Sequence, residues 1–429
     1  MHITKSADKI TPFGGFNFCY EHFHQSGLAD LIDRQLGERV QTRGFSYSDI
    51  VGNQLGIFLC GGDCAEDLAE HLSGPLDQIK GMSASSPDTI LRGIKELSQQ
   101  TTEQINPASG VAHQFNINTP LNELLVGALQ VTGQLNKQDC YDLDYDNQVI
   151  ATEKWDAART YKKCNGYQPA VASIGNKPVY IEGRGGNSPA TYAQQQTLKR
   201  VFETLSNHQV SIGRFRADSA SYQKEVVKIV ENQCNSFCIR AKRSPAMEQQ
   251  VGALPEDDWK SVAISGQPMD VAELSGWRPF GGDRAYRLVL SRIKRADGQA
   301  DIFSGGAYTW RAILTDEQEA APEEVVAFYN GRGASERLFD VMGNDFGWSK
   351  LPCSLLSHNT AFMILTGIIA NFYRYLIERY AQQLSWLQPT FRLKKFIFRF
   401  ISVPAKWIRT GRRAVLKLYT DKDYSPLLA

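Results

Sequence analysis

The stretch Cys140-Tyr141-Asp142-Leu143-Asp144-Tyr145-Asp146 decides how the rest of the sequence is interpreted. Its acidic residues recur with period two, which is typical of a β-strand and places Asp142, Asp144 and Asp146 on one face. Aspartate is a poor strand former, and three aligned carboxylates repel one another unless something neutralises them. The pattern therefore indicates a bound cation, although a polar edge strand has the same spacing, and spacing alone does not pick the ligand.

A second acidic position follows another predicted strand, which runs from Gln209 and ends at Asp218. Ser219, Ala220 and a helical stretch come next. Because open sheets present ligands at the carboxyl ends of their strands, Asp218 is a second candidate ligand. Aspartate also caps helix N-termini, and the two roles are compatible.

The third acidic candidate is Glu336, on a helix predicted from Pro322 to Met342. Tyr329, Arg332 and Glu336 are related as i, i+3 and i+7, so they share one helix face. An arginine one turn from the glutamate can orient it or contact phosphate. A solvated surface stripe is the alternative, and the glycines at 331 and 333 disfavour a straight helix.

Two strand-end aspartates and a distant helical glutamate are a recognised way to hold two divalent ions. Carboxylates suit hard cations such as Mg²⁺. Two ions about 3.5–4 Å apart clamp the attacking and leaving oxygens of a phosphoryl transfer. No side chain then needs to be the nucleophile, because a water or a DNA 3′-hydroxyl can be activated by metal.

The order of predicted elements is mixed α/β. Three strands (140–146, 166–171 and 179–182) precede a helix at 190–205, the strand at 209–218, a helix at 222–230, a strand-rich stretch at 233–315, and helices at 322–342 and 361–380. No G-x-G-x-x-G follows the first strand, and the glycines at 183–187 have the wrong spacing, so this is not a doubly wound dinucleotide fold. A Walker A motif is also absent from the sequence.

These motifs together resemble a known family. Tyr329-x-x-Arg332-x-x-x-Glu336 matches the Y-x₂-R-x₃-E signature of bacterial insertion-sequence DDE transposases, and residues 215–220, Phe-Arg-Ala-Asp-Ser-Ala, resemble their second-aspartate motif. Residues 143–146 followed by Lys154, Gly-Tyr-Gln-Pro at 166–169 and Arg-Gly-Gly-Asn at 184–187 resemble the 1380 group in particular. The resemblance runs from the N-terminal helices to about Lys417.

The resemblance implies an RNase H-like catalytic core with a β-rich insertion between the second aspartate and the glutamate, plus a helical N-terminal DNA-binding region. It also implies two Mg²⁺ ions, for which Mn²⁺ would substitute, and double-stranded transposon ends as substrate. By comparison with related families the catalytic, metal-binding residues are Asp146, Asp218 and Glu336, with Asp144 the close second for the first position. Two departures are Gln148, where a threonine is frequent, and Gly343, where a lysine is frequent.

Five regions are expected along the chain. They are a helical DNA-binding and dimerisation region (1–135), the first part of the RNase H-like core (136–232), the β-rich insertion (233–315), the second part of the core with the glutamate helix (316–385), and a basic DNA-binding segment (386–429). Within the first region, Ser86 is expected to cap a helix that opens with Pro87.

Net charge is only +1, but its distribution is uneven. From Arg379 to Thr420 there are ten Lys or Arg residues and no Asp or Glu, so the rest of the chain carries −9. Such a segment suggests a polyanionic partner bound by one region. The predicted DNA contacts are Tyr329, Arg332, Arg392, Lys394, Lys395, Arg399, Lys406, Arg409, Arg412 and Arg413. An amphipathic helix on a membrane or a subunit is the alternative, which Pro404 disfavours by interrupting it.

The cysteine content fits a reducing cytoplasm, and the resemblance implies a bacterial protein associated with the nucleoid. No signal peptide is visible at the start, and the apolar stretch Ala361–Tyr375 is too short and too interrupted to span a bilayer, so a buried helix is expected. Eight cysteines in 429 residues do not form a disulfide framework, and their spacings do not match zinc knuckles.

The predicted function is DNA transposition. A homodimer would pair the two terminal inverted repeats, cleave the DNA in a Mg²⁺-dependent step and join the released 3′-hydroxyl to target DNA. No membrane partner is expected. Two alternatives are a catalytically silent, transposase-derived DNA-binding protein, and an RNase H-like nuclease that hydrolyses DNA without joining it.

Overall fold

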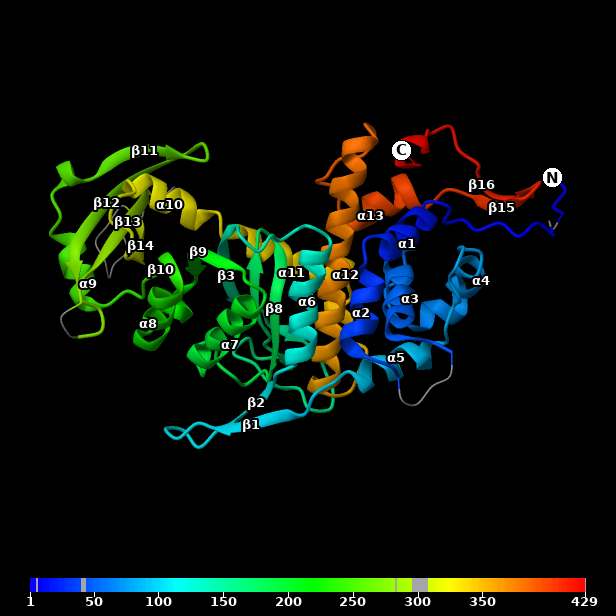
Figure 1. Cartoon of the computed structure of the whole chain (residues 1–429). Coiled ribbons are helices and arrows are strands. Elements are labelled where there is room, and N and C mark those ends of the chain that lie inside the picture. Colours follow the sequence, from blue (N-terminus) through cyan, green and yellow to red (C-terminus); the bar gives the residue numbers. More distant parts are fainter. Residues whose placement is uncertain (5–6, 40–43, 282–283, 295–307, 429) are drawn as a thin grey trace.

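The computed structural model describes residues 1–4, 7–39, 44–281, 284–294 and 308–428 (Figure 1). The helices are α1 (Phe16–Gln25), α2 (Leu28–Leu36), α3 (Tyr47–Leu59), α4 (Ser73–Leu76), α5 (Pro87–Glu96), α6 (Thr119–Val131), α7 (Gln194–Asn207), α8 (Lys224–Gln233), α9 (Pro245–Gly252), α10 (Pro322–Asn330), α11 (Gly333–Asp345), α12 (Leu356–Gln383) and α13 (Leu393–Phe396). The strands are β1 (Thr101–Ile105), β2 (Ala112–Asn116), β3 (Cys140–Asn147), β4 (Ile150–Ala151), β5 (Ala158–Arg159), β6 (Asn165–Tyr167), β7 (Ala170–Ile174), β8 (Lys177–Arg184), β9 (Ser211–Ala217), β10 (Cys234–Arg240), β11 (Lys260–Ile264), β12 (Gln267–Trp277), β13 (Tyr286–Lys294), β14 (Tyr308–Thr315), β15 (Ala405–Thr410) and β16 (Arg413–Leu418).

One sheet of eleven strands runs through the molecule in the order β1-β2-β8-β7-β3-β9-β10-β14-β13-β12-β11. At its centre β8, β7 and β3 are antiparallel neighbours, and β9 and β10 continue parallel to β3. Three antiparallel strands followed by two parallel ones, with the first strand in the middle, is the RNase H-like arrangement. The predicted fold class is therefore confirmed, because the chain has an RNase H-like α/β core. Strands β11–β14 extend the sheet on one side of this core, and the N-terminal helices join it on the other (Figure 1).

The two faces of β3 differ in chemistry, as period two requires. Leu143 and Tyr145 are buried in an apolar cluster that also contains residues of α7 and α8. Asp144 and Asp146 occupy the opposite face, where both form ion pairs. The sheet thus carries its carboxylates on the side away from α7, and this choice of face decides which elements can complete a site with them.

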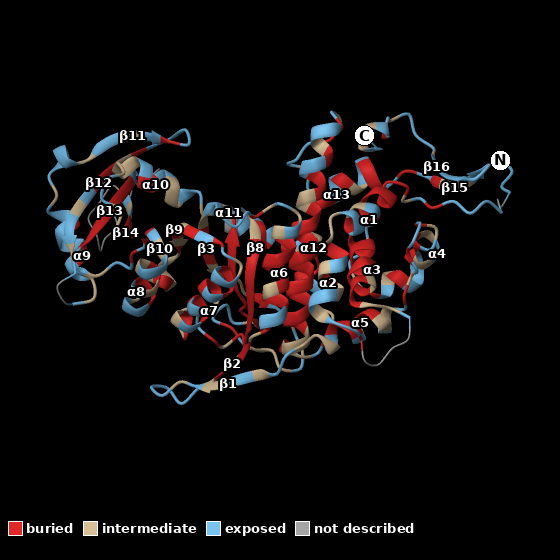
Figure 2. Ribbon diagram, in the orientation of Figure 1, coloured by how far each residue is buried: buried red, intermediate tan, exposed pale blue. Residues whose placement is uncertain are grey.

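The largest buried element is α12, whose residues pack in one cluster with α1, α3, α6 and α11 (Figure 2). It is the one helix in the described part of the chain that is long and apolar enough to cross a membrane by length and composition, and 89% of its apolar window is buried inside the protein. The stretch 361–375 is therefore buried, as expected, and the helix extends beyond it at both ends.

Helices α6 and α12 attach to β8 through buried amides. The side chain of Asn122 in α6 accepts from the N–H of Ile181 and donates to its carbonyl, at 2.8 and 2.9 Å. Asn371 in α12 donates to the carbonyl of Pro178 at 3.0 Å. These bonds satisfy backbone groups on the part of the β8 edge that β2 does not cover, so both helices are held in register with the sheet.

Two predictions about elements need correction. The helix expected over 322–342 is divided into α10 and α11 by a turn at Gly331–Arg332. The N-terminal region also contains the hairpin β1–β2, whose second strand pairs with β8. Within the strand-rich stretch, β10 pairs with β9, and the later strands continue the main sheet from β10 through β14.

The contact between β8 and α12 yields a stability prediction. A Cβ at Gly183 would lie 1.9 Å from Thr360 Oγ1 and 3.2 Å from Asn116 Cβ, and all three positions are buried. We expect Gly183→Ala to destabilise the fold by about 1–3 kcal/mol through overpacking. Gly252→Ala is the matched control, because a Cβ there meets no atom within 4 Å. Thermal unfolding measures both, and equal melting temperatures would contradict the packing described here.

Candidate active site

Asp146 and Asp218 lie side by side because of the register between β3 and β9. These strands are parallel, and Tyr145 pairs with Ala217. Asp146 follows Tyr145, and Asp218 follows Ala217. Both aspartates therefore lie one residue beyond this pair, at the same end of the sheet. In neighbouring parallel strands, equivalent positions face the same way, and the two carboxylates therefore belong to one surface.

Asp218 is also the cap of the turn that follows it. Its Oδ1 accepts the N–H of Ala220 at 3.0 Å at the start of a short 3₁₀ turn, residues 219–221. Helix α7 holds that turn in place, because its buried Gln194 donates to Ser221 Oγ at 2.6 Å. Capping uses one oxygen of Asp218 and fixes the rotamer, which leaves the other oxygen available to a ligand.

Glu336 reaches the same neighbourhood from the first turn of α11, where its side chain is exposed. The break after α10 turns the chain at Arg332, whose Nη2 donates to Asp146 Oδ2 at 2.6 Å. Tyr329, on the last turn of α10, feels the charges of Arg332, Asp218 and Asp146. The Y-x₂-R-x₃-E residues are thus gathered around the strand-end aspartates, although they come from two helices.

The negative charges of Asp218 and Glu336 both act on Asp146. Burial raises the pKa of Asp146 to about 6; Arg332 opposes this shift, whereas the negative charges of Asp218 and Glu336 add to it. Burial, the largest single effect on Arg332, lowers its pKa, but the charges of Asp146, Tyr329, Asp218 and Asp144 together outweigh burial and raise that pKa. Asp146 therefore lies where negative charge is in excess and where a cation is favoured.

Each aspartate on this face of β3 has its own arginine. Asp142 pairs with Arg214 and Asp144 with Arg216, both through two bonds of 2.7–2.8 Å from the adjacent strand β9. Asp146 has a single arginine bond, from Arg332 of the α10–α11 turn. The three ion pairs explain how three aligned carboxylates are tolerated on one strand.

The pair Asp144–Arg216 is buried and structural. Their side chains are 1% and 11% exposed, against 37% and 49% for Asp142 and Arg214. Arg216 also donates from Nη1 to the carbonyl of Phe328 at 2.6 Å, and its guanidinium stacks on the Phe328 ring. A Cβ at Gly331 would lie 2.6 Å from the same Nη1, which gives a reason for glycine there. Arg216 thus ties the end of α10 to the sheet.

Sequence reasoning missed Arg214 and Arg216. The signal was available, because arginines two residues apart on one strand can match aspartates two residues apart on its neighbour. What the sequence lacked was the register, which alone pairs Asp142 with Arg214 and Asp144 with Arg216.

The donor set of Asp146, Asp218 and Glu336 fits divalent metal. All three offer carboxylate oxygens, which hard cations prefer, and the excess of negative charge at Asp146 is what such a cation would neutralise. Their oxygens are not all within 4.8 Å of one another. Ligand oxygens on opposite sides of two such ions can be roughly 8 Å apart, because the ions are about 3.5–4 Å apart and each is about 2.1 Å from its ligands. A two-ion site therefore does not require all the carboxylate oxygens to lie within 4.8 Å of one another.

Among the described residues, the group whose ligand atoms do all lie within 4.8 Å is Asp63, Cys64 and Asp67. Asp67 Oδ2 accepts the N–H groups of Asp63 and Cys64 at 2.8 and 3.2 Å, and Lys350 pairs with Asp63 at 2.5 Å. Local hydrogen bonds account for this cluster.

Comparison with known proteins identifies the family. The family model described as Transposase DDE domain group 1 matches residues 8–429. The chain belongs to this transposase family. A piggyBac transposase, solved as a synaptic complex with hairpin DNA, is similar at 11% identity and a TM-score of 0.43, over 89% of this chain and 84% of that one. No curated protein matches the sequence.

Membership in the family makes the protein a transposase that acts on DNA, and the family uses divalent metal ions. The residues that we expected to bind DNA lie in two places. Tyr329 and Arg332 are beside Asp146, whereas the basic segment forms α13, a π-helical turn at Ile397–Ile401 and the hairpin β15–β16. Figure 1 shows that this hairpin projects at the end of the molecule opposite β11–β14.

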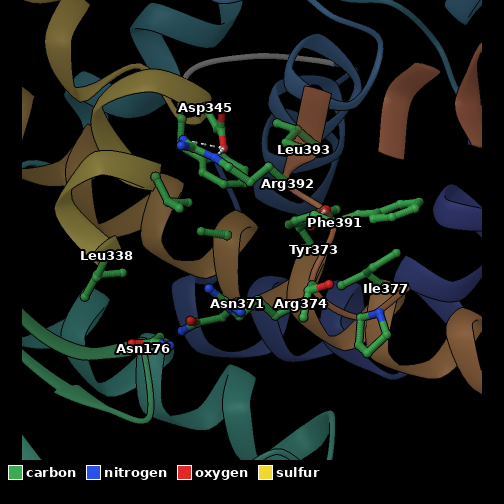
Figure 3. Close-up of a pocket in the computed structure, with 15 residues that line it drawn as sticks. Asn176, Leu338, Asp345, Asn371, Tyr373, Arg374, Ile377, Phe391, Arg392 and Leu393 are labelled. Atoms are coloured by element: carbon green, nitrogen blue, oxygen red, sulfur yellow. Dashed lines mark hydrogen bonds and ion pairs between the residues drawn. The ribbon is translucent and has the colours of Figure 1, made fainter. Parts of the chain in front are cut away.

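Residues of the basic segment differ in how available they are. Arg392 pairs with both Asp340 and Asp345 of α11, beside a cavity of about 60 Å³ (Figure 3). These two ion pairs neutralise the charge of Arg392 and hold this segment of the transposase against α11. Lys406 lies 3.5 Å from Asp8. The predicted DNA contacts of this segment that are exposed and form no ion pair among the described residues are Lys394, Lys395, Arg399, Arg409, Arg412 and Arg413.

The aromatic residues interleaved with this segment are divided in the same way. Phe396 and Phe400 are fully buried and stack on Tyr380 of α12, whereas Phe398 is 72% exposed. The aromatic pattern of this segment therefore reflects its attachment to the core.

The two ion pairs on β3 and β9 provide a prediction. Asp144→Asn should leave Arg216 buried without a charged partner, which costs about 3–5 kcal/mol. Asp142→Asn breaks a pair of the same geometry that is exposed, and should cost about 0–1 kcal/mol. Thermal unfolding of the transposase checks the contrast, with an expected fall of roughly 5 °C or more for Asp144→Asn alone. If the two variants melted together, Asp144 would not have the structural role assigned to it.

Proposed function

We propose that this transposase cleaves DNA at the ends of its element and joins the 3′-ends to target DNA, using Mg²⁺ held by Asp146, Asp218 and Glu336. The observation that carries the proposal is the register of β3 with β9, which aligns the two aspartates at one end of the sheet. The like-charge effect of Glu336 on Asp146 supports the third ligand. Asp144 is not among the ligands, because both its oxygens are bonded by Arg216.

Bound ions at these carboxylates would activate the attacking oxygen and stabilise the leaving oxygen of the phosphate displacement. The protein's own residues bind and orient the DNA strand. The Arg332 side chain is 16% exposed, so its guanidinium can donate to a phosphate oxygen while Nη2 holds Asp146. Burial raises the pKa of Tyr329, which keeps its hydroxyl protonated and able to donate to phosphate.

Binding along the duplex is assigned to the hairpin β15–β16. A two-stranded β-ribbon fits the major groove of B-DNA, and Arg409, Arg412 and Arg413 are exposed towards its tip. The hairpin lies away from β3 and β9 (Figure 1), so it would hold DNA at a distance from the cleaved bond. We infer that two copies pair two ends, because transposition joins both ends of one element.

The catalytic proposal is tested by cleavage of DNA that carries the sequences flanking the coding region. We expect Asp146→Asn, Asp218→Asn and Glu336→Gln each to lower the Mg²⁺-dependent nicking rate by at least about 100-fold, because each removes a charged metal ligand. Asp142→Asn is the control, since it removes a carboxylate from the same strand face and should cleave at the wild-type rate.

The same experiment can reject the proposal. Full activity in Asp218→Asn would show that the metal site lies elsewhere. Joining is measured separately with a pre-cut end that carries a 3′-hydroxyl. Hydrolysis by wild type without joining would identify a nuclease, and binding without cleavage would identify a silent DNA-binding protein.

A further prediction concerns the hairpin. Replacing Arg409, Arg412 and Arg413 with alanine should weaken binding to duplex DNA and reduce the slope of log K against log salt by about 0.9 for each phosphate that the variant no longer neutralises. Lys137, Lys199 and Lys228, which are exposed before β3 and on α7 and α8, give a control with the same change in charge. An unchanged salt slope in the hairpin variant would exclude the hairpin from the interface.

A further inference from the structure

The chain between β3 and β7 makes a compact excursion just after Asp146. It contains a separate three-stranded sheet in the order β4-β6-β5. β6 ends at Tyr167, and three residues later Ala170 opens β7 by pairing with Asn147, the neighbour of Asp146. The excursion therefore lies at the same end of the main sheet as the candidate active site.

Two aromatic side chains on this excursion face solvent. Trp155 is 87% exposed, which is more than any other described aromatic residue, and Tyr161 is 71% exposed. Tryptophan and tyrosine usually bury a large apolar surface, so an indole ring left open beside a second exposed ring is a candidate contact for a partner.

The exposure of Trp155 does not come from a loose loop. Its backbone N–H donates to the carbonyl of Ser354 at 3.1 Å. The next residue, Asp156, accepts the N–H of Leu356 at 2.8 and 3.0 Å and also the hydroxyl of Tyr167. The backbone that carries the indole is thus anchored to the start of α12, while the ring itself stays uncovered.

The charge around the two rings favours a polyanion. Arg159, Lys162 and Lys163 are exposed on the same excursion. The acidic residues beside them are engaged, because Glu153 accepts from Asn165 and Asp156 is bonded as described above. Aromatic rings among available cations are the combination that proteins use to bind unpaired nucleotides, with bases stacking on the rings and phosphates meeting the cations.

Chain length places these residues within reach of the cleaved bond. Trp155 lies nine positions after Asp146, and a fully extended chain of that length spans at most roughly 32 Å. One turn of B-DNA is about 34 Å long. Trp155 therefore lies no farther from Asp146 than about one helical turn of DNA.

We propose that Trp155 and Tyr161 form a platform that stacks an unpaired nucleobase of the DNA near the cleavage site, with Arg159, Lys162 and Lys163 binding its phosphates. An unpaired base is the partner that fits, because in an intact duplex the faces of the bases are covered by their neighbours. The proposal rests on the proposed function for the position of the DNA. It adds a contact that distinguishes DNA with unpaired bases from plain duplex.

Binding without cleavage tests the platform. The full-length protein, in buffer without divalent metal, is titrated with a duplex that ends blunt and with the same duplex carrying a short single-stranded thymine extension. We expect wild type to prefer the extended DNA by about 5- to 150-fold, as stacking of one base predicts. The extension should also quench tryptophan fluorescence.

Matched variants separate stacking from other effects. Trp155→Ala should lose the preference and the quenching, whereas Trp155→Phe, which keeps an aromatic ring at the same exposed position, should keep most of the preference. The double variant Lys162→Ala/Lys163→Ala should weaken the binding of both DNAs. Light scattering of each variant reports the oligomeric state.

Two results would overturn the platform. One is equal preference in wild type and Trp155→Ala. The other is loss of an oligomer in Trp155→Ala without loss of the preference, which would make a second copy of the chain the partner. Because metal is absent from the titration, a failure of the cleavage proposal would leave the preference for unpaired DNA intact and would be recognised separately.

Discussion

The parallel pairing of β3 with β9 is the constraint on which the site depends. Its register, with Tyr145 opposite Ala217, sets Asp146 beside Asp218 and also sets Asp142 and Asp144 opposite two arginines. A slip of one residue would turn each side chain to the other face and bury carboxylates among the apolar residues around α7. Burial of the apolar residues Leu143, Tyr145 and Phe215 therefore stabilises the register that places Asp146 beside Asp218, because any other register would expose them.

The ladder of ion pairs separates structural acids from a candidate ligand on one strand. Asp144 has both oxygens bonded and almost no exposure, so it supports the fold. Asp146 has a single arginine bond and is repelled by two further carboxylates, Asp218 and Glu336. A bound cation would offset this repulsion. The same residue type, two positions apart, thus differs in role because of the number and origin of its partners.

Local signals in the sequence predicted much of this structure. The acidic alternation predicted β3, the apolar run before Asp218 predicted β9, and Ser86 caps α5 by accepting from Thr89 as expected. These features are decided by residues near in sequence. The division of the helix at Gly331 was foreshadowed only by its glycines, because its cause is the approach of Arg216 from a strand more than a hundred positions away.

Features that depend on long-range pairing could not be predicted in the same way. The turn residues 106–110, Asn-Pro-Ala-Ser-Gly, were a visible hairpin signal, but the pairing of β2 with β8 follows from how the N-terminal helices dock. The arginine partners of Asp142 and Asp144 required the register of two strands that are about seventy positions apart. The buried phenylalanines of the basic segment likewise required knowledge of α12, which they cover.

Helix α12 connects the parts of the molecule that would have to act together. Its first residue lies against the excursion that carries Trp155, its middle supports β8, and Tyr380 near its end packs on Phe396 and Phe400 of the basic segment. A single buried helix of 28 residues therefore fixes the separation between the candidate active site and the C-terminal hairpin. Because such a helix is stiff and about 42 Å long, DNA held at the hairpin would be presented to the aspartates at a set distance, and the spacing of contacts along the DNA becomes a property of the fold.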